Sequence, residues 1–275
     1  MWFLYPKGKV SKIQEQQLTT IGGNISALEI DGTFDDCQDM VKKAFLDKEL
    51  NNKFNLTSAN SINVARWLPQ AFYYFYAVKK LKKKNLVFSV PSGNFGNICA
   101  GIIAMKLGLP IDHFVASTNV NDTIPRYFKS KVLSPKPTIQ TISNAMDVSN
   151  PSNFIRIQEM FENFDTLSSF LSSYSFDDYQ TLEIVKEIYN NKNYIMDPHG
   201  AVGYLGLKKY LKNKPNKIGV FLETAHPIKF SKHIENTIDV KLKIPKKINK
   251  ILSKNKKYID IENYNDFKKK ILNMF

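Results

Sequence analysis

The sequence predicts an α/β fold with largely parallel sheets flanked by helices. Short apolar segments typical of strands alternate with longer segments that carry apolar residues at helical spacing. A turn of small polar residues, Ser92–Asn97, joins one such strand to one such helix. With 275 residues, 43% of them apolar, the chain can bury a substantial core in one large domain or two modest ones.

The first four elements follow from their local patterns. Residues 2–6, "WFLYP", predict a buried strand, and their apolar character favours a central position in a sheet. Residues 10–22 have helical spacing and close on a Gly-Gly pair, while residues 24–32 alternate like a strand. Residues 33–50 predict one helix, because an acidic pair occupies the first turn, where it favours the helix dipole.

The later elements follow from the same periodicities. A long apolar helix is expected over 61–81, and a strand over 87–90 leads through the polar turn into an apolar helix ending near Gly108. After these, in chain order, we expect a strand at 113–119, an irregular stretch rich in Pro, Ser and Asn at 134–153, helices at 155–173 and 176–191, and a strand at 217–224.

The charge of +14 is nearly all lysine, and arginine occurs only at Arg66, Arg126 and Arg156. The lysines of 79–84 fall at a helix end, where they suit the dipole and the solvent. No basic run is interleaved with aromatic residues in an RNA-reading pattern, so we expect solvated surface charge and no nucleic-acid partner. No apolar run is long enough to cross a bilayer, and we expect no membrane partner.

Two cysteines, Cys37 and Cys99, lie in segments of helical pattern without metal-ligand spacing. They predict buried thiols in a reducing compartment, hence a cytoplasmic location and no metal site.

The turn "SGNFGN" has the features of an anion site at the carboxyl end of a strand. Gly93 and Gly96 can adopt backbone angles closed to other residues and let a ligand approach, and the helix that follows directs unpaired N–H groups outward. Ser92, Asn94 and Asn97 add short hydrogen-bonding side chains. The turn is neither the dinucleotide-binding G-x-G-x-x-G nor a P-loop, and a plain strand–helix turn remains the alternative.

Eight segments in one order carry a more specific signal. They are "LYPKGKVSKIQEQQLTT" (4–20), "GTFDDCQ" (32–38), "TSANSINVARWLPQ" (57–70), "VPSGNFGN" (90–97), "NVNDTIPRYF" (119–128), "SNAMDVSNPSNF" (143–154), "DPHGAVGY" (197–204) and "ETAHPIKF" (223–230). Together they resemble an N-terminally truncated member of the threonine synthase family, pyridoxal-phosphate enzymes of fold type II, the tryptophan-synthase-β type. The resemblance runs from about residue 3 to residue 235.

The resemblance implies a cofactor site for pyridoxal 5'-phosphate. Gly93, Asn94 and Phe95 match the family's phosphate cup, within the turn Ser92–Asn97, and Gly96 and Asn97 continue it. Thr224 matches the threonine whose hydroxyl faces the pyridine nitrogen.

The family's substrate is O-phosphohomoserine, a small molecule with a phosphate and a carboxylate. Arginine's planar fork suits both groups, and Arg66 is the preferred anion clamp, with Asn60 and Lys7 as weaker candidates for substrate contact. Arg126 and Arg156 are expected to be structural.

The histidines carry no nucleophile or metal pattern. His199 and His226 lie in motif segments and are expected to fix loops by hydrogen bonds, whereas His113 and His233 carry no signal.

The resemblance also implies a domain division. Residues 1–62 would be the remaining part of a small α/β domain that is incomplete, and residues 63–240 the large cofactor-binding domain. Residues 241–275, rich in Lys and Asn, would extend the large domain. The exposed sheet edge of an incomplete domain predicts poor solubility.

The Schiff-base lysine of the family lies in an "FKDFG"-like motif that precedes the segment matching Leu4–Lys9, and no lysine here has that context. We therefore expect no catalytic residue of this kind in the chain and little activity from the chain alone, with a separately encoded N-terminal portion as a possible partner. The expected reaction converts O-phospho-L-homoserine and water to L-threonine and phosphate. The alternatives are a decayed or repurposed non-catalytic protein of the same fold and, from another class, a basic nucleic-acid-binding module.

Overall fold

The computed structural model describes residues 1–274. Its contacts divide the chain into two compact units, one formed by Met1–Thr57 together with the segment from Lys241 onward, and one formed by Ser58–Val240. Each unit is an α/β layer structure with an entirely parallel sheet, as the alternating pattern predicts.

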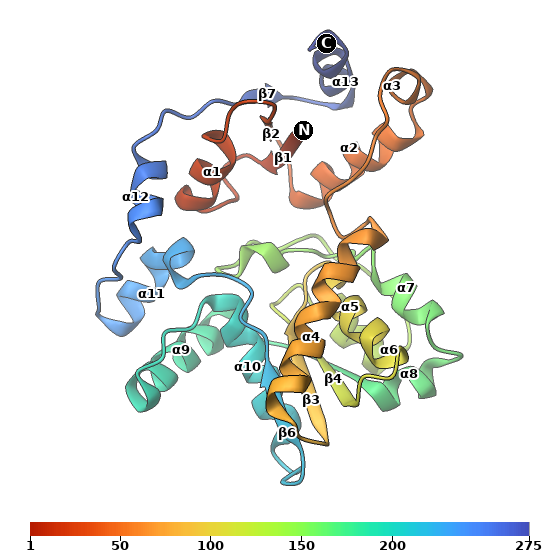
Figure 1. Cartoon of the computed structure of the whole chain (residues 1–275), viewed down its shortest axis with the longest axis vertical. Helices are drawn as coiled ribbons and strands as arrows, with labels where there is room; N and C mark the ends of the chain where they lie inside the picture. Colours follow the sequence, from red (N-terminus) through yellow and green to blue (C-terminus); the bar gives the residue numbers. More distant parts are fainter. Residues whose placement is uncertain (275) are drawn as a thin grey trace. The chain divides into compact units, whose positions relative to one another are not determined.

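The smaller unit has a three-stranded sheet in the order β1-β2-β7 (Figure 1). Its strands are β1 (Trp2–Pro6), β2 (Ser26–Ile30) and β7 (Ile259–Ile261). Its helices are α1 (Lys12–Thr19), α2 (Phe34–Leu46), α3 (Lys48–Lys53), α12 (Lys246–Leu252) and α13 (Tyr264–Asn273). The core joins Leu28 and Ile30 of β2 to Phe267 and Ile271 of α13.

Three expectations for this unit differ from the structure. β1, which was expected to be central, lies at an edge of the described sheet. It pairs only with β2, which is the central strand. Asp47 divides the helix expected over 33–50, since its side chain accepts hydrogen bonds from the backbone N–H groups of Glu49 and Leu50 and so caps a new helix. Residues from 241 onward join this unit and not the larger one, because β7 pairs in parallel with β2.

The larger unit has a four-stranded sheet in the order β5-β4-β3-β6. Its strands are β3 (Leu86–Pro91), β4 (Ile111–Thr118), β5 (Leu171–Ser175) and β6 (Ile218–Phe221). Its helices are α4 (Trp67–Leu81), α5 (Gly96–Lys106), α6 (Thr123–Ser130), α7 (Phe154–Glu159), α8 (Phe164–Phe170), α9 (Asp178–Lys192), α10 (Pro198–Leu211) and α11 (Ser231–Ile238), with 3₁₀ turns at Val64–Arg66, Asn144–Met146 and Pro227–Phe230.

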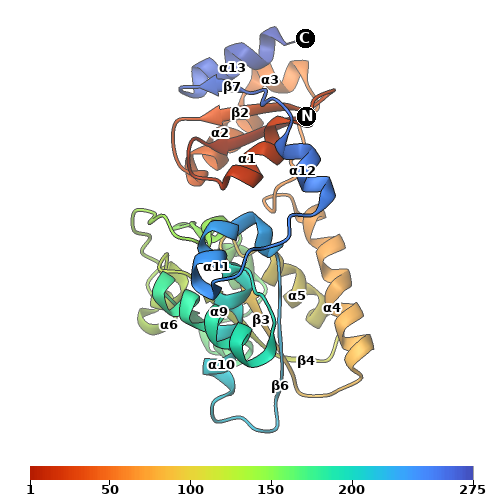
Figure 2. The same ribbon diagram turned by 90° about the vertical axis from the view of Figure 1, so that its left-hand side faces the viewer.

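Alternate residues of β3 face the two helical layers of this unit. Phe88 and Val90 pack against α4 and α5, whereas Val87 packs against Leu207 of α10. Figure 2 shows α4 and α5 on one side of β3 and α9 and α10 on the other. The helix α10 lies close to the sheet, and the hydroxyl of Ser89 donates to the carbonyl of Gly203 at 2.6 Å.

The helix expected over 155–173 is divided into α7 and α8, and its last three residues form the start of the strand β5. Its polar sequence "LSSYS" has no strong strand periodicity, and its pairing with β4, from Phe114↔Leu171 to Thr118↔Ser175, decides the conformation. The long helix expected over 61–81 begins as the 3₁₀ turn Val64–Arg66 and becomes α-helical at Trp67.

Within residues 1–274, no helix is long and apolar enough to cross a membrane.

Candidate functional site

The turn after β3 presents backbone N–H groups that have no acceptor within residues 1–274. The strand ends at Pro91 and α5 begins at Gly96. The first amide of α5 that donates to a carbonyl of the turn is that of Cys99, which bonds to Phe95 at 3.1 Å. Among the described residues, none accepts a hydrogen bond from the amides of Gly93–Asn97. These residues are buried or half-buried, so an anion is the partner that would satisfy the amides.

The glycines of this turn are required by close approach. A Cβ on Gly93 would lie 2.8 Å from the carbonyl oxygen of Ala145, and a Cβ on Gly96 would lie 2.3 Å from the Cβ of Ser61. The left-handed backbone expected at the glycines occurs instead at Phe95, with φ of 61°. The turn is therefore held by its neighbours against an unfavourable backbone conformation at Phe95.

The side chain of Asn94 braces the turn. Its Nδ2 donates to Ser61 Oγ at 3.1 Å, and its Oδ1 accepts from the backbone N–H of Ser152 at 2.7 Å. Asn153 Nδ2 donates both to the carbonyl of Asn94, at 2.9 Å, and to Ser61 Oγ, at 3.0 Å. Three segments far apart in the sequence thus meet at this turn.

The other two polar side chains of the turn also bind protein groups. Ser92, which is buried, donates its hydroxyl to the carbonyl of Val90 at 2.8 Å. Asn97 Oδ1 accepts from the hydroxyls of Tyr73 and Tyr74 on α4. The groups left for a ligand are therefore the main-chain amides, and the side chains of Ser92, Asn94 and Asn97 shape the turn.

Thr224 follows the strand next to the turn. β6 pairs in parallel with β3, and the amide of Leu222 continues the pairing by donating to the carbonyl of Ser89 at 3.1 Å. Two residues later, Thr224 lines an open pocket of about 410 Å³ with Tyr194, Glu223 and Lys229. Neighbouring parallel strands end at the same sheet edge, so the Gly93–Asn97 turn and Thr224 both lie at that edge.

Arg66 and Asn60 precede α4 in the same unit. Arg66 is exposed, and its guanidinium has no hydrogen-bond or ion-pair partner within the described part of the chain. The Oδ1 of Asn60 accepts from the hydroxyl of Ser61 at 3.2 Å. The same hydroxyl accepts from Asn94 Nδ2, in the Gly93–Asn97 turn.

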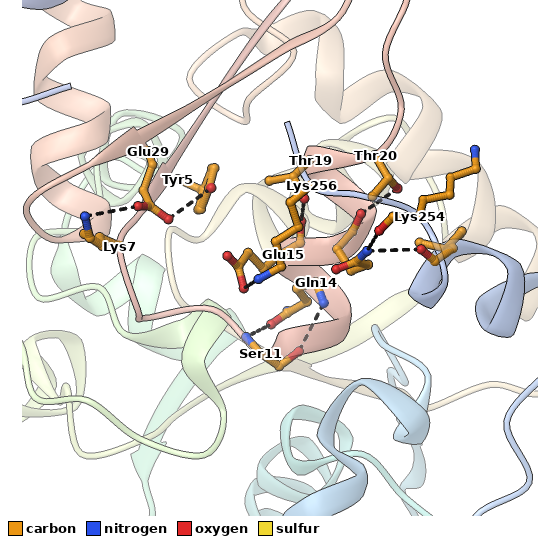
Figure 3. A network of polar contacts seen from close by, with 12 residues as sticks. Tyr5, Lys7, Ser11, Gln14, Glu15, Thr19, Thr20, Glu29, Lys254 and Lys256 are labelled. Carbon is orange, nitrogen blue, oxygen red and sulfur yellow. Dashed lines mark hydrogen bonds and ion pairs between the residues drawn. The ribbon is translucent and has the colours of Figure 1, made fainter. Parts of the chain in front are cut away.

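Lys7 belongs to the smaller unit. Its ammonium lies 3.3 Å from Asp260 Oδ1. It also lies 3.4 Å from Glu29 Oε2, and Tyr5 donates its hydroxyl to Glu29 at 3.1 Å (Figure 3). These ion pairs raise the pKa of Lys7 above its usual range, because the hydrogen bonds that its ammonium donates to Asp260 and Glu29 stabilise the charged form.

The other two arginines are structural, as expected. Arg126 Nε lies 2.8 Å from Oδ1 of Asp122, the residue that precedes α6. Arg156 Nη2 donates to the carbonyl of Ile62 at 2.9 Å, and its guanidinium lies 5.2 Å from the centre of the Trp67 ring. Arg156 therefore holds the segment that carries Ser61.

Both motif histidines fix loops, as expected. His199 Nδ1 lies 2.6 Å from Asp197 Oδ1, and its Nε2 accepts from the backbone N–H of Ala145 at 3.3 Å. His226 Nδ1 accepts from the amide of Ile228 at 3.1 Å and caps a 3₁₀ turn.

Cys37 and Cys99 are free and buried, and burial raises the pKa of each thiol to about 12. Among the residues that the structure covers, no group of three or more His, Cys, Asp or Glu could hold a metal ion.

Sequence reasoning did not assign roles to Ser61, Ser152 and Asn153. Each lies in a motif segment, "NSIN" or "PSNF". The presence of these residues in the motifs was the only sequence feature that could have indicated a role at the turn.

Comparison with known proteins identifies the family. The family model "Pyridoxal-phosphate dependent enzyme" matches residues 3–222, and the model "Threonine synthase, C-terminal" matches residues 200–271. The threonine synthase of Haemophilus influenzae is 49% identical over 250 residues, which cover 90% of this chain and 58% of that protein. The threonine synthase of Escherichia coli is 46% identical over 248 residues, which cover 89% of this chain and 57% of that protein.

Solved structures give the same result for the fold. The crystal structure of threonine synthase from Escherichia coli matches all of this chain and 64% of its own, with a TM-score of 0.95 and 42% identity. The crystal structure of pyridoxal-phosphate-bound threonine synthase from Brucella melitensis matches 99% of this chain and 64% of its own, with a TM-score of 0.86 and 30% identity. The fold type expected from the motifs is confirmed, and the chain spans somewhat less than two thirds of these relatives.

Proposed function

The chain belongs to the pyridoxal-phosphate-dependent enzymes and, within them, to the threonine synthases, and on this premise we propose that its larger unit supplies the cofactor and substrate anion sites of that activity. The proposed reaction is the conversion of O-phospho-L-homoserine and water to L-threonine and phosphate. The observation that carries the proposal is the run of unpartnered amides at Gly93–Asn97, at the sheet edge where Thr224 also lies.

The residues present fit pyridoxal phosphate. The amides of Gly93–Asn97 would hold its phosphate, because they are unsatisfied, half-buried and adjacent to a helix N-terminus. The hydroxyl of Thr224 would lie at the pyridine nitrogen. When bound, the cofactor supplies an electron sink for the charge that develops on the carbon atoms of the substrate.

Arg66 is proposed to bind an anionic group of the substrate. Its unpartnered guanidinium can form the paired hydrogen bonds that a phosphate or carboxylate accepts. Asn60 and Lys7 remain weaker candidates, and the ion pairs of Lys7 with Glu29 and Asp260 account for part of its hydrogen-bonding capacity.

The cofactor-binding lysine is proposed to come from polypeptide outside these 275 residues, as a separately encoded N-terminal portion. An origin of this lysine outside these residues is supported by the lack of an "FKDFG"-like motif among them and by the 58% share of the Haemophilus influenzae relative that they match. The exposed apolar side chains of α4, at Leu68, Phe72 and Tyr76, offer a surface for such a partner. We also propose a cytoplasmic location, supported by the two unpaired buried cysteines.

The cofactor proposal is tested by titrating the purified chain with pyridoxal phosphate and with pyridoxal, followed by fluorescence. The phosphate-bearing compound is expected to bind at least tenfold more tightly, since about 1.4 kcal/mol corresponds to tenfold and several amides contribute. Equal affinities would remove the assignment of the Gly93–Asn97 turn.

The activity proposal is tested by assaying phosphate release from O-phosphohomoserine with the chain alone and with a co-expressed N-terminal portion of a threonine synthase. We expect turnover only for the pair, and Arg66→Ala in the pair should lower kcat/KM while Lys79→Ala, on the exposed part of α4, should not. Full turnover by the chain alone would contradict the assignment of the lysine to another segment. Nothing in the comparisons supports a non-catalytic protein or a nucleic-acid-binding module.

A further inference from the structure

Two tyrosines of α4 bind the carboxamide of Asn97, which ends the Gly93–Asn97 turn and lies in the first turn of α5. The hydroxyl of Tyr74 lies 2.8 Å from Asn97 Oδ1 and 3.1 Å from the carbonyl oxygen of the same residue. The hydroxyl of Tyr73 donates to the same Oδ1. Since α4 packs beside α5 on one side of β3 (Figure 2), these contacts join α4 directly to the turn.

The ring of Tyr74 is held in place independently of these hydrogen bonds. It is fully buried, and its centre lies 5.1 Å from that of Phe88 and 6.1 Å from that of Phe114. A Cβ on Gly101, one turn after Asn97 along α5, would lie 2.7 Å from the Cζ of Tyr74. The close approach of the two helices at Gly101 therefore brings the Tyr74 hydroxyl to Asn97.

Tyr73 lies at the surface beside Tyr74. The centres of the two rings are 4.9 Å apart, and Tyr73 is 36% exposed, whereas Tyr74 is fully buried. Because Tyr73 lies outside the core, its hydroxyl can be removed with little effect on folding. Tyr73→Phe is therefore the variant in which a role of the hydroxyl can be separated from a role in packing.

The two hydroxyls occupy the acceptor capacity of the Asn97 side chain. A carboxamide oxygen has two lone pairs, and each tyrosine hydroxyl supplies one proton. The backbone amides of Gly93–Asn97 have no acceptor within the described part of the chain. Asn97 Oδ1 would be a competing acceptor for them, because an Asn side chain can accept from its own or a neighbouring backbone N–H. The tyrosine hydroxyls prevent this competition.

We propose that Tyr73 and Tyr74 are positioning residues, which hold the carboxamide oxygen of Asn97 away from the amides of the Gly93–Asn97 turn and so keep these amides available to an anion. Without the hydroxyls, Asn97 Oδ1 accepts from an amide of the turn, and a phosphate has to displace that bond in order to bind. The proposal rests on the proposed function only for the identity of the anion.

The first test needs no ligand and measures hydrogen exchange of the backbone amides. In the wild-type chain the amides of Gly96 and Asn97 should exchange readily, since they have no acceptor. In Tyr73→Phe one of them should become severalfold better protected, because the freed Oδ1 accepts from it. A tyrosine that only braced the two helices would give the opposite result, faster exchange in the variant. Tyr179→Phe, at an exposed position on α9, is the control and should change neither amide.

The double variant Tyr73→Phe/Asn97→Leu isolates the carboxamide oxygen. Leucine is close to asparagine in size and has no acceptor, so the extra protection expected in Tyr73→Phe should disappear. Equal or lower protection in Tyr73→Phe than in the wild type would overturn the proposal. Extra protection that persists in the double variant would overturn it as well, because the acceptor would then not be Asn97 Oδ1.

The second test uses pyridoxal phosphate and pyridoxal as probes. In Tyr73→Phe the affinity for pyridoxal phosphate should fall about fivefold, the effect of displacing one internal hydrogen bond. The affinity for pyridoxal, which carries no phosphate, should be unchanged, and adding Asn97→Leu should restore the affinity for pyridoxal phosphate. A double variant that binds pyridoxal phosphate no better than Tyr73→Phe would contradict the proposed role. Failure of the wild-type chain to bind this probe would contradict only the proposed function, since the exchange measurements are made without it.

Discussion

At the scale of single residues, the conformation of the Gly93–Asn97 turn depends on the close approach of Gly96 to Ser61. A Cβ on Gly96 would lie 2.3 Å from the Cβ of Ser61 and 2.9 Å from its Oγ, whereas the next contact, Asn153 Nδ2, is at 3.4 Å. The steric conflict is therefore almost entirely with one side chain.

This fit gives a prediction for a double substitution. Gly96→Ala should destabilise the chain by about 1–3 kcal/mol through overpacking and weaken cofactor binding. Adding Ser61→Gly removes the clashing atoms and should recover part of the loss, although the acceptor of Asn94 and Asn153 is gone. Urea unfolding of both single variants and the double variant measures the coupling. Additive effects would contradict this account of Gly96.

A second residue-scale prediction concerns Asp147, which anchors the irregular segment over 134–153. Its carboxylate accepts from Asn119 Nδ2 at 2.8 Å and from the hydroxyl of Thr141 at 2.7 Å, while burial raises its pKa to about 6. The folded state then binds this proton more tightly than the unfolded state, so the contribution of Asp147 to stability grows as the pH falls from 7 toward 4.

The comparison that isolates this effect is with Asp147→Asn, which does not titrate. The free energy of unfolding of the wild type, minus that of the variant, should increase from pH 7 to pH 5 in urea titrations. A difference that stays constant over this range would show that Asp147 has an ordinary pKa in the folded protein.

At the scale of elements, α4 exposes an apolar face. Leu68, Phe72 and Tyr76 are 57%, 69% and 63% exposed and recur at four-residue intervals, so they lie on one side of the helix. The opposite side carries Trp67, Ala71 and Tyr74 into the core. A contiguous apolar face of this kind favours association.

We therefore predict that Phe72→Ser together with Tyr76→Ser reduces self-association of the chain in light scattering. The free energy of unfolding should change by less than about 0.5 kcal/mol, because neither side chain is buried. Tyr179→Ser, at an isolated exposed position on α9, is the matched control and should leave association unchanged. Unchanged association of the double variant would mean that α4 does not cause it.

The elements also show which parts of the structure the sequence could predict. β3 and α5 were predicted because their apolar patterns are strong and local, and the turn between them was predicted because its glycines and asparagines lie close together in the sequence. β5 and β7 were not predicted. The five residues of β5 are mostly polar and β7 has only three residues, so neither has a clear strand periodicity. Their conformation depends on pairing with β4 and β2.

The limits for the site have the same origin. The support of the turn by Ser61, Asn153 and Arg156 was not predicted, because these residues are distant in sequence and meet only through tertiary packing. The break at Asp47 was missed because the apolar pattern continues across it, although its side chain caps α3. Local chemistry was therefore predictable, and contacts between distant segments were not.

At the scale of the whole molecule, the two units have separate hydrophobic cores. The core of the smaller unit joins the first and last parts of the chain, through β2 with β7 and through Leu28 and Ile30 with Phe267. The core of the larger unit is built from Trp67 to Leu171 around β3 and β4. Because each core is complete without side chains of the other, a defect in one is expected to remain local.

Phe267→Ala tests this independence. Phe267 is 4% exposed, and its truncation should cost the smaller unit about 3–5 kcal/mol, exposing the amides of β1, β2 and β7 to hydrogen exchange. The amides of β3 and β4 in the larger unit should keep their protection, and pyridoxal-phosphate affinity at the Gly93–Asn97 turn should be unchanged. Tyr258→Ala, at a 44% exposed position next to β7, provides the control and should alter neither unit. Loss of protection throughout both sheets in Phe267→Ala would instead mean that the units unfold as one cooperative body, and that the anion-binding turn depends on the C-terminal strand that pairs with β2.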